Sequence, residues 1–333
     1  MFFGGTVMNF AFAGFRHGHV NSLYKLASTT DEVNIVGAWE ENEPARKAAE
    51  ENLGVVFTYE KYEDMLNDPN VDVVVLGNYY GARGQMGIDA LNAGKHIIGD
   101  KPLCTSLDEL NEIEKLAADK NLKVGCMLDL RNTHYTHCAR EIIQSGKLGE
   151  IHNILFEGQH ALMYGKRASW YFEKGKHGGT INDIAIHGID LVRYITGLEL
   201  EEVLAARTWN AFATEEPDFK DCGQFMTKLS NGAGLMADVS YAAPQGCEFN
   251  LPFNWRFVFW GTKGVMEFSH AREDVYIAYE FGAEPVVLKP EKPANTYLDD
   301  FLSDIKGKKV DFNTAEVIAS TRTALTIQAA ADK

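Results

Sequence analysis

The sequence predicts an α/β protein in which a doubly wound parallel sheet is followed by a second α/β domain with a large, mostly antiparallel open sheet. Over the first third of the chain, short apolar runs alternate with amphipathic stretches, the pattern of strands joined by crossover helices. Runs such as "VDVVVLG" are apolar at almost every position, as in parallel strands that are buried on both faces. From about residue 150 the strands have period 2 and are joined by turns such as "SNGAG" and "GTKG", which indicates antiparallel pairing.

This change of pattern divides the chain into a first domain over residues 1–128 and a second over residues 129–333, with a C-terminal helix that can pack back on the first domain. The alternation predicts strands in the first domain at residues 9–13, 33–39, 55–58, 71–76, 95–99 and 123–127, and helices at residues 19–28, 44–52, 59–66, 84–93 and 106–120. The second domain is predicted to hold strands at residues 151–160, 203–211, 223–229, 232–241, 255–260 and 265–270, and helices at residues 180–196, 297–306 and 313–331.

Composition narrows the class of protein. The net charge is −15, which argues against nucleic acid and anionic membranes as partners. The five cysteines are scattered and form no C-x-x-C pair, as expected for reduced thiols in the cytoplasm. No apolar run approaches the ~20 residues that span a bilayer. The apolar stretch over residues 1–15 has no Lys or Arg and no cleavage site, so we expect no signal peptide and a cytoplasmic protein.

The first strand runs into "AGFRHGHV", a glycine turn before a helix, as in the Rossmann dinucleotide-binding loop. Gly14 can serve as the first glycine of such a loop, whose backbone approaches a pyrophosphate at the helix N-terminus. Arg16 stands where the middle glycine belongs and Gly18 is one position short of the last, so an ordinary strand–turn–helix connection is the alternative. The second strand is followed by Glu40, a carboxylate that can accept hydrogen bonds from ribose hydroxyls. An exposed acidic turn is the alternative there.

Two further motifs carry candidate catalytic residues. Lys101 directly precedes Pro102 at the end of a predicted strand, which holds the lysine stiffly toward the cleft, although a surface lysine would give the same sequence. In "HGGTINDIAIHGIDLVRYITG", a glycine pair precedes a helix on which Asp183 and His187 are four residues apart and share one face. A carboxylate beside an imidazole can set its tautomer and raise its basicity. A buried structural pair is the alternative.

These motifs resemble those of the glucose–fructose oxidoreductase / inositol dehydrogenase family (Gfo/Idh/MocA). The segment "AGKHIIGDKPL" is similar to the family's Glu-Lys-Pro segment, and "GGTINDIAIHGIDLVRYITG" to its second motif, an Asp and a His four apart after a glycine pair. Between them, "CMLDLRNTHYTHCAREIIQSGKLGEIHNI" is similar to the crossover segment, with Arg131 and a turn at residues 146–149. The similarity covers roughly residues 9–305, with the motifs in the expected order.

The resemblance implies an NAD(P)-dependent oxidoreductase that moves a hydride between nicotinamide and a secondary hydroxyl of a sugar, cyclitol or related polyol. Lys101, Asp183 and His187 match the family's catalytic lysine, aspartate and histidine. The resemblance also implies a homodimer or homotetramer that forms through the C-terminal sheet.

The chain departs from the family pattern at three places. The opening loop lacks the middle glycine, and Asp100 replaces the glutamate of Glu-Lys-Pro. The segment "GNYYGAR" replaces the usual Thr-Pro-x-x-x-His, so that Arg83 stands at the histidine position. Because this segment lies along the cofactor in the family, we expect a nicotinamide pocket of different shape.

The expected cofactor-binding residues lie at the strand ends and in the crossover segment: Gly14, Phe15, Arg16, His17, Glu40, Asn78, Tyr79, Asp100, Lys101 and Asp129. Arg16 or His17 is expected to supply positive charge to the pyrophosphate, which would offset some of the backbone hydrogen bonds that a middle glycine makes possible. Because Glu40 would lie close to a 2′-phosphate, NAD is favoured over NADP.

In the implied mechanism His187 takes the hydroxyl proton as general base, oriented by Asp183, and Lys101 stabilises the developing alkoxide. Which of Lys101 and His187 is the formal base stays open. Aromatic and arginine side chains that suit a sugar or sugar acid precede the second motif, among them Tyr164 and Tyr171. The expected substrate-binding residues are Lys101, His160, Arg167, Trp170, His177, Asp183 and His187.

Four other interpretations remain open. One is a redox-neutral glycosidase or lyase in which tightly held NAD transiently oxidises the sugar, and another is a non-catalytic ligand sensor on the same fold. A third is a zinc site formed by His160, His177, Asp183 and His187, although their spacing matches no metal motif and we expect no bound metal. The fourth is that the C-terminal sheet, with strands such as "WRFVFWG", is chiefly an assembly surface, which is compatible with catalysis.

Overall fold

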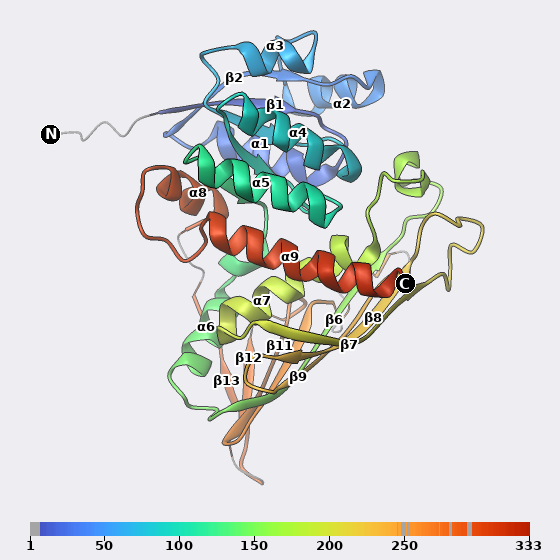
Figure 1. Cartoon of the computed structure of the whole chain (residues 1–333). Helices are drawn as coiled ribbons and strands as arrows, with labels where there is room; N and C mark the ends of the chain where they lie inside the picture. The colour runs from blue at the N-terminus through green and yellow to red at the C-terminus, as the bar shows by residue number, and fades with distance from the viewer. Residues whose placement is uncertain are drawn as a thin grey trace, which may run out of the picture. The chain divides into compact units, whose positions relative to one another are not determined.

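A computed structural model describes residues 7–333 except residues 245, 248–250, 252, 253, 273, 280, 281 and 292–294. The first six residues of the apolar N-terminal stretch therefore lie outside the described chain. The chain divides into two compact units, one formed by Met1–Leu128 and Thr296–Thr321, the other by Asp129–Asn295 and Arg322–Lys333 (Figure 1). The C-terminal segment thus contributes to both units.

The first unit contains a parallel sheet with the strand order β2-β1-β3-β4-β5. Its strands are β1 (Met8–Ala13), β2 (Val33–Trp39), β3 (Val73–Leu76), β4 (His96–Gly99) and β5 (Val124–Cys126). Its helices are α1 (Gly18–Ser28), α2 (Glu43–Leu53), α3 (Tyr62–Asn67), α4 (Tyr80–Asn92), α5 (Leu107–Asp119) and α8 (Tyr297–Ile305). This is the doubly wound sheet that the sequence predicts.

Helices cover both faces of this sheet. The ring of Phe10 on β1 lies 6.5 Å from that of Phe301 on α8. Gly87 of α4 packs so closely that an added Cβ would lie 3.2 Å from Ile97 on β4. The strand register places Phe10 and Ile97 on opposite faces. Burial on both sides explains why the strands are apolar at nearly every position.

The strand predicted at residues 55–58 is wrong. Gly54 ends α2 in the left-handed conformation (φ 68°), and the amide of Val55 donates back to the carbonyl of Ala49 (3.4 Å). The amides of Thr58 and Tyr59 both donate to the carbonyl of Ala38, at the end of β2. After this tight helix end, too few residues remain to pair along a neighbouring strand. Residues 55–58 therefore form an irregular connection.

The second unit contains an eight-stranded sheet with the order β13-β12-β11-β10-β6-β9-β8-β7. Its strands are β6 (Ile151–Ala161), β7 (Leu200–Trp209), β8 (Cys222–Leu229), β9 (Gly234–Ala243), β10 (Arg256–Gly261), β11 (Gly264–Ser269), β12 (Val275–Ala278) and β13 (Val286–Leu288). Its helical elements are η1 (Asp129–Asn132), α6 (His134–Gln144), η2 (Ser169–Phe172), η3 (Ile181–Ala185), α7 (Ile186–Thr196) and the end of α9 (Thr314–Ala331). Only β6 and β9 pair in parallel, which confirms the mostly antiparallel second sheet. α6, β12 and β13 are not among the elements predicted from the sequence.

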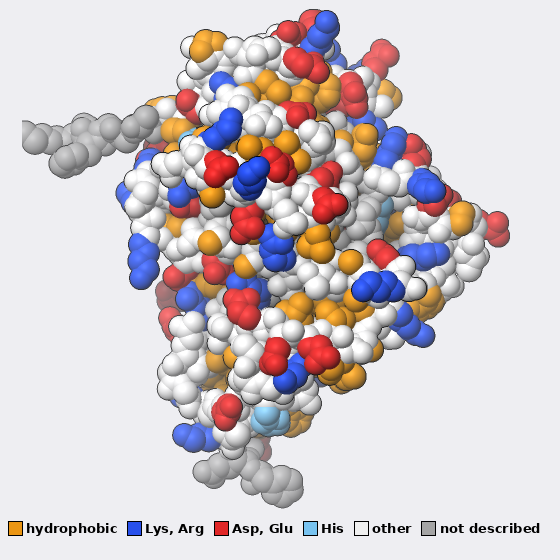
Figure 2. Space-filling model, viewed as in Figure 1, with side chains coloured by type: hydrophobic (Ala, Val, Ile, Leu, Met, Phe, Trp, Pro, Cys, Tyr) orange, Lys and Arg blue, Asp and Glu red, His pale blue; other side chains and the backbone are white. Residues whose placement is uncertain are grey.

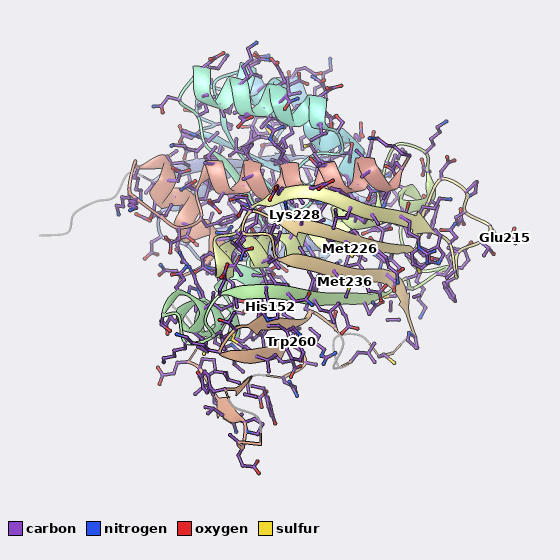
Figure 3. All side chains as sticks on the ribbon, turned by 60° about the horizontal axis from the view of Figure 1, so that its bottom comes forward. His152, Glu215, Met226, Lys228, Met236 and Trp260 are labelled. Carbon is purple, nitrogen blue, oxygen red and sulfur yellow. The ribbon has the colours of Figure 1, made fainter. Side chains whose placement is uncertain are left out.

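One face of this sheet is covered and the other is open. On the covered face, a Cβ at Gly188 of α7 would lie 2.4 Å from Phe156 of β6. On the open face, Met226 and Met236 lie opposite each other in the β8–β9 register, with 41% and 45% of their surface exposed (Figure 3).

A buried ion pair joins η1 to α7 in the same unit. Arg131 donates from Nε to Oδ2 of Asp190 (2.7 Å) and from Nη2 to Oδ1 (2.8 Å), and its guanidinium lies 4.7 Å from the ring centre of Tyr194. Both charged residues are almost fully buried. Two parallel hydrogen bonds compensate both charges where water cannot reach them.

The described helices include none that is both long and apolar enough to cross a bilayer. On the face drawn in Figure 2, Lys and Arg side chains are interspersed with Asp and Glu, so neither sign gathers into one large patch there.

Candidate active site

The cofactor-binding residues predicted in the first unit follow the carboxyl ends of neighbouring strands. Gly14 follows β1, Glu40 follows β2, Asn78 follows β3 and Asp100 follows β4. In a doubly wound sheet this edge is where nucleotides bind, next to the point at which the strand order reverses. Here that point lies between β1 and β3.

The loop after β1 has the shape of a pyrophosphate cradle. Gly14 has a φ of +98°, and a Cβ there would lie 2.6 Å from the amide nitrogen of Asn78, so only glycine fits. The next helix, α1, begins at Gly18, and the side chain of its N-cap residue, His17, bonds to Asp100 instead of capping the helix. A helix N-terminus that its own N-cap side chain does not close is suited to an anionic group. The residues present therefore fit a dinucleotide.

The carboxylate of Glu40 is fixed at the end of β2. Its Oε2 accepts a hydrogen bond from the amide of Phe15 (2.6 Å) and its Oε1 from the amide of Asn42 (2.8 Å). Glu40 is 3% exposed, and this burial raises its pKa, although the two amides and Arg16 oppose the rise. The position suits a ribose, while Phe15 itself contributes its backbone and packs its ring against Phe12 and Tyr24.

The two residues proposed to supply positive charge differ in their surroundings. Burial lowers the pKa of His17 to about 4, although the charge of Asp100 beside it opposes this shift. Arg16 lies 3.9 Å from Glu40 and 4.0 Å from Glu41, with its guanidinium 5.7 Å from the ring centre of Tyr79. That Arg16 or His17 supplies positive charge to a pyrophosphate stays a prediction.

Lys101 follows a fully buried carboxylate. Lys101 is 4% exposed, its peptide bond to Pro102 is cis, and Asp100 before it is completely buried. Burial pushes the pKa of Asp100 up, but His17 and the guanidinium of Arg83 beside it hold that pKa well below its usual value. The strand end therefore keeps an ionised carboxylate next to the candidate catalytic lysine.

One set of possible metal ligands occurs in the described residues. The ligand atoms of His17, His19 and Asp100 lie within 4.8 Å of one another, and no other set of three among the described residues does so. The four residues considered for zinc, His160, His177, Asp183 and His187, do not come together in this way. The guanidinium of Arg83 lies 2.9 Å from Asp100 and occupies part of the carboxylate.

The second unit holds the predicted substrate residues other than Lys101, with Asp183 and His187 at the start of a helix. Asp183 lies on η3, a single turn of π-helix, and His187 lies on α7, which continues it. Gln328 of α9 closes the start of this helix, because its Oε1 accepts hydrogen bonds from the amides of Ile181 (2.9 Å) and Asn182 (3.2 Å). Single π-turns of this kind are common at functional sites.

Asp183 belongs to a buried chain of polar groups. The hydroxyl of Tyr241 donates to Oδ2 of Asp183, and Nε2 of His177 lies 2.9 Å from that hydroxyl and 3.5 Å from the carboxylate. All three side chains are at most 3% exposed. Because the phenol gives its hydrogen to Asp183, its oxygen accepts from His177. The suggestion that Asp183 orients His187 stays a prediction.

Aromatic rings surround these polar groups. The ring of Trp255 lies 5.2 Å from that of His187 and 5.5 Å from that of His160, in edge-to-face contacts. The guanidinium of Arg167 lies 5.3 Å from the ring centre of Tyr241 and donates to the carbonyl of Ala161. The structure thus brings His160, Arg167, His177 and Asp183 together around Tyr241.

Three other candidates belong to this unit. Trp170 is 2% exposed, and its ring lies 4.2 Å from that of Tyr171, which in turn lies 5.1 Å from the ring of His177. Tyr164 is exposed and bonds to Glu216 (2.7 Å). Asp129 is exposed in η1.

Tyr241 and Trp255 are not among the site residues predicted from the sequence. Tyr241 occupies an inward position of β9, in phase with Leu235, Ala237 and Val239, where the other inward side chains are apolar. A phenol at the end of such a row was the available signal, because a buried tyrosine hydroxyl needs a partner. Trp255 directly precedes β10 and gave no such signal.

Comparisons with known proteins agree with this geometry. Residues 8–127 match a model described as an oxidoreductase family with an NAD-binding Rossmann fold, and residues 136–267 match the GFO/IDH/MocA C-terminal domain. Levoglucosan dehydrogenase of Pseudarthrobacter phenanthrenivorans is 29% identical over 260 residues, 71% of this chain and 65% of that protein. Myo-inositol 2-dehydrogenase of Thermotoga maritima is 26% identical over 273 residues, 78% of this chain and 76% of that protein.

Solved structures show the same fold over nearly the whole chain. An inositol dehydrogenase homologue from Azotobacter vinelandii, complexed with NAD+, superposes with a TM-score of 0.82 at 15% identity and covers 98% of this chain and 96% of its own. Levoglucosan dehydrogenase in complex with NADH gives 0.81 at 21% identity, with 98% and 97% covered. With both domain models matched in order, the chain belongs to the Gfo/Idh/MocA family of NAD-binding oxidoreductases.

Proposed function

We propose that this protein is an NAD-dependent dehydrogenase that oxidises a secondary hydroxyl of a sugar, cyclitol or related polyol. The observation that carries the proposal is that one chain keeps both a dinucleotide cradle, around Gly14 and Glu40, and a buried polar chain, formed by His177, Tyr241 and Asp183. The relatives named after levoglucosan and myo-inositol support a ring-shaped polyol as substrate.

In the proposed reaction, Lys101 and His187 have the roles that the family resemblance implies for them. When bound, the nicotinamide supplies the hydride acceptor at its C4. His187 accepts the proton of the substrate hydroxyl, and the ammonium of Lys101 donates a hydrogen bond to the same oxygen and stabilises the developing negative charge. The buried chain from Asp183 through Tyr241 to His177 belongs to the same unit as His187 and fixes the carboxylate of Asp183 in place.

The first test is a titration of the purified protein with NADH and with NADPH, followed by nicotinamide fluorescence. Absorbance of the starting material is recorded beforehand to detect nucleotide already bound. We expect binding of NADH and NAD+-dependent oxidation of myo-inositol, levoglucosan or another polyol in a panel. A cofactor-free sample that binds neither nucleotide would overturn the proposal in favour of a sensor. Product formation without net NADH, from protein purified with nucleotide, would point to the redox-neutral reaction.

We expect Glu40→Gln to reduce the preference for NADH over NADPH by about tenfold or more. The substitution removes the negative charge that would repel a 2′-phosphate and leaves Arg16, 3.9 Å away, to attract it. The measurement is the ratio of the two dissociation constants. Glu41→Gln is the matched control, because Glu41 also lies 4.0 Å from Arg16 but is exposed. Equal shifts in both variants would contradict a specific role of Glu40.

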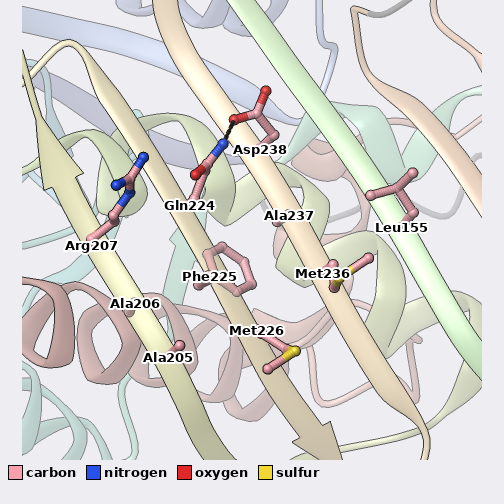
Figure 4. A pocket seen from close by; sticks show the side chains of 10 residues that line it. All are labelled: Leu155, Ala205, Ala206, Arg207, Gln224, Phe225, Met226, Met236, Ala237 and Asp238. Atoms are coloured by element: carbon pink, nitrogen blue, oxygen red, sulfur yellow. Dashed lines mark hydrogen bonds between the residues drawn. The ribbon is translucent and has the colours of Figure 1, made fainter. Parts of the chain in front are cut away.

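We further propose that the open face of the second sheet binds a second copy of this chain. Cross-strand register aligns Met226, Met236, Leu155 and Val258 in one apolar row across β8, β9, β6 and β10. A groove of ≈ 410 Å³ lies over part of this row (Figure 4). In the neighbouring row Arg207 and Arg256 flank Asp238 and Glu157. A row with both signs can pair with a copy of itself about a twofold axis.

The variant Met236→Glu should therefore shift the protein toward the monomer. It places a charge beside Met226 at the centre of the apolar row, where an interface between two copies would bury it unpaired. Analytical ultracentrifugation over a range of concentrations measures the change. Val56→Glu, at an exposed apolar residue of the first unit, serves as control. A wild-type protein that is monomeric throughout would rule the interface out.

A further inference from the structure

The places at which this chain departs from its family pattern meet at one carboxylate. Asp100 stands where the family has glutamate, and its Oδ2 lies 2.5 Å from Nδ1 of His17 and 2.9 Å from Nη2 of Arg83. Its Oδ1 lies 3.2 Å from Nδ1 of His19. Arg83 stands where the family has histidine, His17 lies in the loop that lacks its middle glycine, and His19 lies in the first turn of α1. All of these contacts lie within the first unit.

Arg83 connects this carboxylate to the backbone around Lys101. Its Nη1 donates to the carbonyls of Asp100 (2.9 Å), Lys101 (3.0 Å) and Pro102 (3.1 Å). Its Nε donates to the carbonyl of Asn78, in the loop after β3 (2.8 Å). The side chain is fully buried. A planar guanidinium directs its N–H groups at all of these acceptors, with the two hydrogens of Nη1 shared among three carbonyls, whereas an imidazole has only two N–H groups.

The same cluster is a poor site for a cation. Two histidines and a carboxylate are ligands that divalent metals accept, but only one negative charge is present. The guanidinium of Arg83 shares that charge, and the ammonium of Lys101 is on the next residue. The positive end of the α1 dipole lies here too. An added dication would be repelled, so the cluster serves to hold loops together beside an anion.

We propose that Arg83 and Asp100 are a matched positioning pair that replaces the family's histidine and glutamate and fixes the backbone of Lys101 against the nucleotide loop. Aspartate is one methylene shorter than glutamate, and arginine reaches farther than histidine, so each change offsets the other. Asp100 also bonds to His17, so the pair links the loops after β1, β3 and β4. This inference rests on the proposed function, because it assigns the pair a part in placing Lys101.

The test is a set of four proteins: the wild type, Arg83→His, Asp100→Glu and the double variant that restores the family's pair. For each we would measure the thermal unfolding midpoint without ligand, the dissociation constant for NADH, and kcat on the polyol identified in the panel. We expect each single variant to lose about tenfold or more in kcat, and the double variant to recover most of that loss. The control is Arg46→His with Glu50→Asp, an exposed pair of α2, which should change nothing.

The outcomes separate the inference from the proposed function. Losses in kcat that simply add in the double variant overturn the pairing. Compensation in the unfolding midpoint with additive losses in kcat shows a structural pair that does not position Lys101, and also overturns the inference. If the wild type binds no NADH, the proposed function fails, and the unfolding midpoints alone decide whether the two residues compensate. If Arg83→His does not fold, a folded double variant supports the pairing, and an unfolded one beside folded Asp100→Glu overturns it.

Discussion

Replacing Lys101 by methionine should lower kcat/KM for polyol oxidation by about 10²–10⁴-fold and change the affinity for NADH by far less. Methionine keeps much of the side-chain volume at this buried position but cannot donate to the substrate oxygen. The developing charge would then lose its nearest preorganised donor. Steady-state kinetics give kcat/KM, and nicotinamide fluorescence gives the affinity for NADH.

The matched control for this prediction is Lys47→Met, because Lys47 belongs to the same unit and its side chain is 72% exposed. Activity of Lys101→Met within a few-fold of the wild type would mean that Lys101 is not part of the reaction. A parallel loss of NADH affinity and activity would instead assign the lysine to cofactor binding.

Replacing Arg131 by methionine should destabilise the second unit by about 3–5 kcal/mol. The change leaves the buried carboxyl group of Asp190 without the two hydrogen bonds that the guanidinium now donates. For a unit of this size, such a loss lowers the unfolding midpoint by roughly 10 °C. Differential scanning calorimetry of the purified protein measures it.

Two comparisons sharpen the Arg131 result. The double variant Arg131→Met/Asp190→Leu should regain most of the lost stability, because no charge is then left without a partner. Glu201→Ala breaks an exposed pair with Lys228 in the same unit and should cost less than about 1 kcal/mol. A single variant as stable as the wild type would show that water reaches Asp190 in solution.

The sequence predicts the edge of the first sheet well because its signals are local. Gly14, Glu40 and Lys101 each follow a strand that the apolar pattern reveals, and parallel strands carry their carboxyl ends to one edge. The strand predicted at residues 55–58 is wrong, and its cause is also local, because Gly54 turns the chain back on α2. The periodicity of apolar residues does not predict which side chain across the sheet each residue contacts.

The substrate residues show this limit more clearly. The spacing of Asp183 and His187 predicts one helical face, but the π-turn at residues 181–185 and the contact with Tyr241 are not local features. Tyr241 lies 58 residues away along the chain, so nothing in the spacing announces it. His17 is a similar case, because burial lowers its pKa and its side chain bonds to Asp100, 83 residues distant.

The capping of the Asp183 helix by Gln328 bears on how the protein is made. The side-chain Oε1 of Gln328 accepts hydrogen bonds from the amides of Ile181 and Asn182, which lie 147 and 146 residues earlier in the chain. During synthesis, the buried amides at this helix start therefore have no acceptor until residue 328 has left the ribosome. Ribosome-bound chains halted before that point should lack a finished substrate unit. Chaperones would be expected to shield this part of the nascent chain for longest.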